Sequence, residues 1–164
     1  NIAGMEALLF YGAAYAVMNL GAFGVVAALQ RRTGVTSNLS TFAGLVRREP
    51  EMAWLLTLFL LSLTGIPPTV GFFGKFLVIS AAVEVGGALT ALAILTVVNA
   101  AIAAFYYLRV VVYMFMRDPA GDLPKLRHGR LLWTGLAVSA FLTIVLGLFP
   151  NLLLEIVGVA AAAI

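Results

Sequence analysis

One lysine, Lys75, lies inside an apolar run that spans residues 52–83, and it follows a group of residues that disrupt helices. That group consists of Gly65, Pro67, Pro68 and Gly71. A charged side chain at the centre of a membrane helix costs about 2.5–3.5 kcal/mol on insertion scales, so such residues usually face the inside of a bundle and mark ion or proton routes. A lysine that has left bulk water can change its protonation state near physiological pH. The residue types therefore predict proton transfer at Lys75.

The run itself is too long to be one straight membrane helix. Its 32 residues would extend for about 48 Å as a continuous helix, whereas the hydrocarbon core of a bilayer is about 30 Å thick. The two prolines remove backbone donors, and the glycines lower the cost of non-helical dihedral angles. We expect two half-helices joined by an unwound stretch at residues 65–69, buried against other helices or beside a water-filled cavity.

Hydroxyl side chains near the break are expected to satisfy the freed backbone groups. Ser62, Thr64 and Thr69 are placed for this role. Asn99, in a later apolar segment, is a possible supporting polar group, although amides within membrane spans more often form interhelical hydrogen bonds. Lys75 also has a simpler interpretation, in which its stem follows the helix and its ammonium reaches the outer headgroups.

The composition places these residues in a membrane protein. The chain has 164 residues, of which 63% are hydrophobic and 10% are charged, whereas soluble domains are about 25% charged. Cysteine is absent, which excludes disulfides, thiolate metal sites and cysteine nucleophiles. The only histidine, His128, lies in a charged loop, so we predict no metal site. The predicted fold class is all-α, a polytopic membrane helix bundle.

Four segments of the single predicted domain, residues 1–164, are long and apolar enough to cross a bilayer. They cover residues 7–29, 52–83, 88–116 and 131–149. After Pro150, an apolar segment with Glu155 is expected to be an extension or an interfacial helix. Residues 38–48 are expected to form a short amphipathic helix on the membrane surface, capped by Asn38 or Ser40.

The basic residues predict the orientation of the bundle. With four spans, the first and third loops lie on the same side, and they contain eight of the ten lysines and arginines. These eight are Arg31, Arg32, Arg47, Arg48, Arg117, Lys125, Arg127 and Arg130. Because positive loops face the cytoplasm, this side is predicted to be cytoplasmic, and Arg109 near it is expected to be an interfacial anchor. The asymmetry also explains the high pI without any nucleic-acid partner.

Several blocks of the sequence resemble one protein family. The block "LSLTGIPPTVGFFGKF" is similar to a segment of the antiporter-like membrane subunits of NADH-quinone oxidoreductase, respiratory complex I. The blocks "YAVMNLGAFGVV", "LSTFAGLVRREP", "NAAIAAFYYLRVVVYMF" and "LGLFPN" resemble the same family and follow in the same order. The resemblance implies that Lys75 corresponds to the central proton-relay lysine of the second of two inverted repeats. It also implies that the chain is the C-terminal part of a longer subunit.

The resemblance implies a proton-translocating subunit in a bacterial inner membrane or an equivalent energy-converting membrane. Its partners would be lipid and other membrane subunits. This chain would bind no cofactor itself, and NADH, FMN, iron–sulfur clusters and quinone would belong to other subunits. Two alternatives stay open from the sequence. The first is a subunit of a multisubunit cation/proton antiporter or membrane-bound hydrogenase, and the second is a structural membrane spacer.

Overall fold

The computed structural model describes residues 2–33, 38–119 and 129–162, and all regular structure in these ranges is helical. The elements are α1 (Ile2–Thr33), the 3-10 helix η1 (Leu39–Phe42), α2 (Leu45–Arg48), α3 (Pro50–Thr64), α4 (Val70–Val85), α5 (Ala88–Met116), α6 (Arg130–Leu148) and α7 (Asn151–Ala162). The predicted all-α bundle is confirmed. Helices α1, α5 and α6 are long and apolar enough to cross a membrane.

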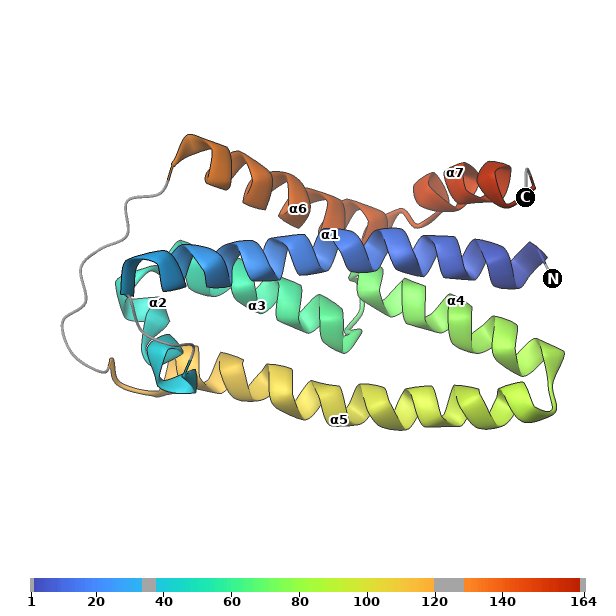
Figure 1. The fold of residues 1–164 in the computed structure, drawn as a ribbon, viewed down its shortest axis with the longest axis horizontal. Coiled ribbons are helices and arrows are strands. Elements are labelled where there is room, and N and C mark those ends of the chain that lie inside the picture. Colours follow the sequence, from blue (N-terminus) through green and yellow to red (C-terminus); the bar gives the residue numbers. More distant parts are fainter. Residues whose placement is uncertain (1, 34–37, 120–128, 163–164) are drawn as a thin grey trace.

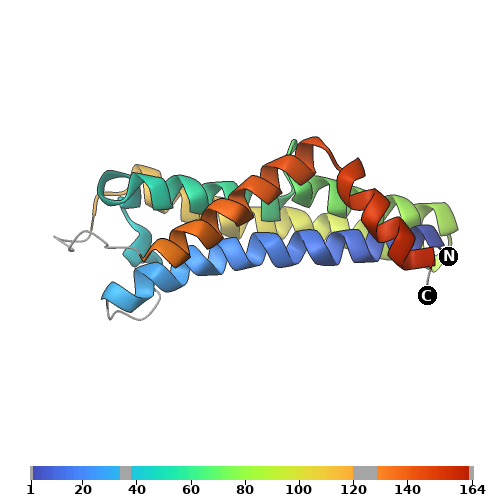
Figure 2. The ribbon, with the colours of Figure 1, turned by 90° about the horizontal axis from the view of Figure 1, so that it is seen from above.

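The helices form four legs that run up and down the long axis of the molecule (Figure 1). Helix α1 is one leg, α3 and α4 together form the second, α5 is the third, and α6 and α7 form the fourth. Helix α1 packs against α3, α4, α6 and α7, while α5 packs against α3 and α4. Seen from above, α6 crosses α1 at an angle and α7 continues beyond a bend toward the start of α1 (Figure 2).

The central helix α1 buries a stripe of apolar residues at helical spacing. The stripe contains Ala7, Phe10, Ala14, Met18, Val25 and Leu29. Two glycines on the same helix allow closer contact. A methyl group on Gly21 would overlap the ring of Phe59, and one on Gly24 would lie 3.0 Å from Cδ2 of Leu136. Small residues therefore let α3 and α6 approach the backbone of α1.

The segment before α3 differs from the expected surface helix. It forms η1 and the single turn α2, and Phe42 and Leu45 are buried rather than turned toward a membrane surface. Gly44, in the left-handed conformation with φ of 63°, reverses the chain between them, and its amide donates to the carbonyl of Tyr113 at 3.1 Å. Asn38 precedes η1 but makes no capping bond with its side chain. These contacts pull the segment inward against α3 and α5.

The first and third loops meet at one end of the bundle. Arg47 of the first loop pairs at 2.7 Å with Asp118, which follows α5 at the start of the third loop, so these parts of the two loops lie on the same side. Gly86 and Gly87 turn the chain at the opposite end, where α1 begins and α7 ends (Figure 1). The guanidinium of Arg109 lies 6.0 Å from the ring centre of Tyr113. Lys125, Arg127 and His128 lie outside the described residues.

The expected boundaries agree with the helices to different degrees. The segment 88–116 coincides with α5, and 131–149 is shifted by one residue from α6. Helix α1 is longer at both ends than the expected 7–29. The segment after Pro150 is helical and packs on α1, so it extends the fourth leg.

Candidate functional site

The second leg is interrupted where the sequence predicts it. Helix α3 ends at Thr64, α4 begins at Val70, and residues 65–69 between them are non-helical. The expected burial of this stretch is only partly correct, because Ile66, Pro67 and Pro68 are exposed. Proline has no backbone N–H, so the two exposed prolines leave no donor without a partner. Thr69 is buried, and α6 approaches this side of the break closely.

Two sets of donors satisfy the last carbonyl groups of α3: the backbone amides of the turn at Gly65, and the side chain of Lys75. A helix leaves its last four carbonyls without partners inside the helix. Gly65, with φ of 93°, turns the chain so that its amide donates to Leu61 and Ser62, and the amide of Ile66 donates to Leu61 at 3.1 Å. This is the Schellman arrangement, which glycine favours because it requires a left-handed residue. It leaves the carbonyls of Leu63 and Thr64 without a backbone donor from this turn.

Lys75 supplies the donors for these two remaining carbonyls. Its Nζ donates to the carbonyl oxygen of Leu63 at 2.6 Å and to that of Thr64 at 2.9 Å. A positive group at a helix C-terminus is favoured because the carbonyl dipoles point toward it, and bonds to an ionised donor are stronger than neutral ones. Gly65 leaves room for the lysine, since a methyl group there would lie 3.2 Å from its Cδ. The side chain thus reaches back across the break instead of outward to the headgroups.

The hydroxyl groups near the break have different roles. Thr69 donates its Oγ1 proton to the carbonyl of Ile66 at 2.7 Å, which satisfies a group freed by the break as expected. Thr64 instead donates to the carbonyl of Leu60 at 2.8 Å within α3, so its side chain satisfies no freed group. Thr64 contributes its backbone carbonyl to Lys75. Ser62 Oγ accepts the amide of Gly71 at 3.3 Å, across the break.

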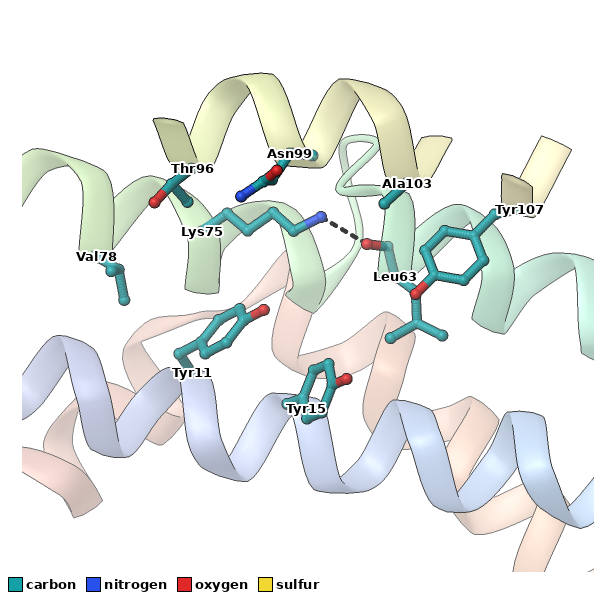
Figure 3. Close-up of a pocket in the computed structure, with 10 residues that line it drawn as sticks. Tyr11, Tyr15, Leu63, Lys75, Val78, Thr96, Asn99, Ala103 and Tyr107 are labelled. Carbon is teal, nitrogen blue, oxygen red and sulfur yellow. Dashed lines mark hydrogen bonds between the residues drawn. The ribbon is translucent and has the colours of Figure 1, made fainter. Parts of the chain in front are cut away.

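Lys75 borders a pocket of about 260 Å³ between α1, α4 and α5. Its polar lining residues are Tyr11, Tyr15, Thr96, Asn99 and Tyr107. The close-up shows the lysine between the tyrosines of α1 and the amide of Asn99 on α5 (Figure 3). The pocket has room for several water molecules and offers them hydroxyl and amide partners. The structure thus places Asn99, which the sequence suggested, beside Lys75, whereas Asn19 donates to Tyr15 within α1.

The tyrosines and Thr96 of the pocket were not predicted from the sequence. A helical stripe could have pointed to them, because Thr96, Asn99, Ala103 and Tyr107 follow a spacing of three, four and four residues. Tyr11 and Tyr15 are likewise four residues apart, and their rings stack with centres 5.7 Å apart. What the sequence did not contain was the evidence that these two stripes face the same lysine.

Known proteins include relatives that are similar to this chain in sequence and fold. Residues 1–103 match the family described as "NADH:quinone oxidoreductase/Mrp antiporter, TM". NADH-quinone oxidoreductase subunit N of Chloroflexus aggregans is 46% identical over 148 residues, which cover 90% of this chain and 29% of that protein. Subunit N of Rhodococcus opacus is 42% identical over 162 residues, covering 98% and 30%. Among the antiporter-like subunits, the sequence blocks quoted above are most similar to subunit N, and these relatives agree with that resemblance.

Solved structures show the same fold. A chain of respiratory complex I from Thermus thermophilus with bound aureothin superposes with a TM-score of 0.75 at 28% identity, covering 92% of this chain and 34% of that one. A chain of the Mrp complex from Dietzia sp. DQ12-45-1b superposes with a TM-score of 0.82 at 25% identity, covering 99% and 38%. The chain spans about 30% of the length of the subunit N relatives. It is an integral membrane protein that belongs to the NADH:quinone oxidoreductase/Mrp antiporter transmembrane family.

Proposed function

We propose that this chain is the proton-relay part of a proton-translocating subunit of NADH-quinone oxidoreductase, and that Lys75 is the group that carries the proton. One observation carries the proposal. The Lys75 ammonium is held at the end of a half-helix by the carbonyls of Leu63 and Thr64 and borders a polar pocket. Unwound helix ends of this kind recur in transporters, where they contact the transported ion.

The geometry suggests how the proton is transferred. An ammonium group has three N–H donors, and two of those on Lys75 bind the carbonyls of Leu63 and Thr64. The third N–H is free to donate into the pocket. When this proton leaves, the neutral amine keeps two N–H bonds for the same two carbonyls, and its lone pair takes the position of the lost hydrogen. The next proton is accepted at that position, so the lysine remains bound through the cycle.

The pocket supplies partners for the exchanged proton. Water between Lys75 and the polar groups of Asn99, Thr96 and the tyrosines would accept and return it, because these groups are hydrogen-bonding donors and acceptors at neutral pH. Tyr11 and Tyr15 border the pocket from α1, and Tyr107 from α5. Water held by these neutral polar groups could therefore exchange a proton with Lys75 without a carboxylate or histidine beside it.

The same proposal includes the membrane, the orientation of the chain in it and the neighbouring subunits. The end that contains Arg47 and Arg48 faces the cytoplasm, by the positive-inside rule, and the membrane is a bacterial inner membrane or its equivalent. Lipid and other membrane subunits surround the chain. NADH, FMN, iron–sulfur clusters and quinone are bound elsewhere in the complex, so redox energy reaches Lys75 from other subunits.

A second candidate is a subunit of a multisubunit cation/proton antiporter. The match to a chain of the Mrp complex from Dietzia over 99% of this chain favours it. Both candidates need a protonatable group at the break, and they differ in whether electron transfer drives the proton. Coupling of proton uptake to NADH oxidation in membranes that contain the complete subunit separates them.

Substitution of Lys75 in the complete subunit tests the relay. Lys75→Gln keeps N–H donors for the break but cannot titrate, and Lys75→Arg keeps a charge that stays protonated. We expect both variants to assemble and to translocate protons about a hundredfold more slowly, at the lower end of the effect of losing a positioned proton-transfer group. The measurements are the rate of proton translocation and the number of protons translocated per electron in vesicles that contain the intact complex.

Arg109→Gln is the matched control, because it also removes one positive charge from an apolar helix but lies outside the pocket. It should translocate protons as the parent does. If Lys75→Arg translocates as well as the parent, Lys75 is an anchoring charge and the chain is a structural spacer at this position.

A further inference from the structure

Ser62 is buried in the last turn of α3, beside the break, and bonds to two other helices. It is 0% exposed, and its Oγ lies 3.3 Å from the amide nitrogen of Gly71 in α4 and 2.7 Å from Sδ of Met18 in α1. Most serines inside a helix either face water or bond to a carbonyl in the preceding turn. Ser62 instead links α3 with α4 and α1.

The bond to Gly71 replaces the missing cap of α4. The first amides of a helix have no partner inside it, and the side chain of the residue before the helix usually accepts one of them. Thr69 holds that position, but its hydroxyl is used by the carbonyl of Ile66 and makes no capping bond. The acceptor for the second amide of α4 therefore comes from Ser62 in the neighbouring half-helix.

Met18 determines which way the serine hydroxyl points. A hydroxyl has one proton to donate, while a thioether sulfur can only accept. Donation of the Ser62 proton to Sδ of Met18 fixes the rotation of the hydroxyl, while a lone pair of the same oxygen accepts the Gly71 amide. Without Met18, the hydroxyl could donate to a carbonyl of its own helix, and this orientation would not be fixed.

The capped amide and the lysine lie on the same face of α4. Gly71 and Lys75 are four residues apart, a spacing that places them about one turn apart on the same face of the helix. Gly71 has no side chain, so the backbone of α4 can lie directly on the carbonyl group of Ser62, where a methyl group would overlap it. Fixing Gly71 on α3 thus sets the height of Lys75 relative to the carbonyls of Leu63 and Thr64.

We propose that Ser62, oriented by Met18, is a positioning residue for the relay: it fixes the start of α4 on α3 and thereby holds the Lys75 ammonium on the last carbonyls of α3. The two half-helices cap each other, since Ser62 of α3 accepts an amide of α4 and Lys75 of α4 donates to carbonyls of α3. This inference rests on the proposed function of Lys75.

The test uses the complete subunit in its assembled complex and two measurements, the rate of proton translocation and the hydrogen–deuterium exchange of the amides at the start of α4. Ser62→Ala should raise exchange at Gly71 about tenfold, because that amide loses its acceptor. It should also slow translocation about tenfold, because Lys75 is no longer held in register. Ser62→Thr keeps the hydroxyl and should restore both. Met18→Leu keeps the volume but removes the acceptor, and it should have the same effects at a smaller size.

Thr57→Val is the matched control. Thr57 is another buried hydroxyl of α3, but it bonds to the carbonyl of Ala53 in its own helix, so its loss should change neither measurement. The double variant Ser62→Ala with Lys75→Gln should translocate no more slowly than Lys75→Gln alone, because residues that act through one another are not additive.

The inference is overturned if Ser62→Ala leaves exchange at Gly71 or translocation unchanged, if Thr57→Val reproduces its effects, or if Ser62→Thr fails to restore them. Failure of the proposed function is a different result. In that case Lys75→Gln translocates as the parent does, while Ser62→Ala still exposes the Gly71 amide.

Discussion

The leg formed by α3 and α4 and the leg formed by α6 and α7 are both interrupted at prolines, but they close the interruption by different means. In the first, the side chains of Ser62, Thr69 and Lys75 bond to backbone groups at or across the break. In the second, the described hydrogen bonds at Phe149 and Pro150 are all between backbone groups.

The second interruption shows what a proline bend needs by itself. The amide of Phe149 donates to Val145 at 2.8 Å, and the carbonyl of Pro150 accepts from Leu154 at 3.0 Å. A proline near the start of a helix is tolerated because its missing N–H would have no partner inside the helix anyway. The bend between α6 and α7 therefore requires no polar side chain. A lysine and a buried serine at the first interruption exceed what bending the chain requires, which is why we assign function to that leg alone.

The two interruptions also touch. Gly147, near the end of α6, lies so close to the first break that a methyl group would overlap the backbone of residues 68–70. The first break is thus supported from outside by the leg formed by α6 and α7.

The largest effect is expected for Gly147→Ala, which separates the two interruptions. The added methyl group meets backbone rather than a flexible side chain, so we expect a loss of about 1–3 kcal/mol of stability, with a lower yield of assembled complex. Thermal unfolding of the purified complex measures it. Gly135→Ala on the same helix has no atom within 4 Å of its new methyl group and should be neutral or slightly stabilising. Equal loss in both variants would show that α6 tolerates no alanine, and the contact between the interruptions would not be the cause.

A smaller effect is expected for Pro150→Ala, which alters the second interruption directly. Alanine restores a donor and frees the backbone, so the cost should be at most about 1 kcal/mol, and proton translocation per electron should stay within about twofold of the parent. A loss of translocation as large as that of Lys75→Gln, with normal assembly, would mean that the two interruptions are functionally equivalent.

The smallest effect is expected for Glu155→Gln. Glu155 is the only charged residue of α7, and like Lys75 it lies in a helix that follows a proline interruption. Unlike Lys75, Glu155 is exposed and lies outside the pocket. Removing its charge should leave both assembly and translocation unchanged, because an exposed charge contributes little. The two variants, Glu155→Gln and Lys75→Gln, are measured in the same assay. A change in translocation for Glu155→Gln would mean that the charge of Glu155 has a function in proton transfer.

The position of the break was predictable because proline and glycine act locally. The residues 65–69 are non-helical for reasons contained in the pentapeptide and its neighbours. The site at Lys75 was predictable only in part. Its bonds to Leu63 and Thr64 depend on how closely α4 returns to α3, and that distance is set by Gly71 and by packing on α1.

Other errors have the same physical origin. The exposure of Ile66 and the prolines, and the inward packing of Phe42, depend on which surfaces other helices cover. Apolar composition does not distinguish a residue that faces lipid from one that faces another helix, because both surroundings are equally apolar. The tyrosines of α1 were missed for this reason.

The occupied carbonyls at the end of α3 also bear on which ion the break can bind. Metal cations such as Na⁺ or Ca²⁺ are held by several oxygen atoms, and unwound helices in transporters often offer bare carbonyls for this purpose. Here the carbonyls of Leu61 and Ser62 accept backbone amides, and those of Leu63 and Thr64 accept the amine of Lys75. In the proposed relay, a metal cation would compete with the Lys75 amine for these carbonyls, whereas a proton would be accepted by the amine itself. All four carbonyls at the end of α3 are thus already bonded to donors of this chain.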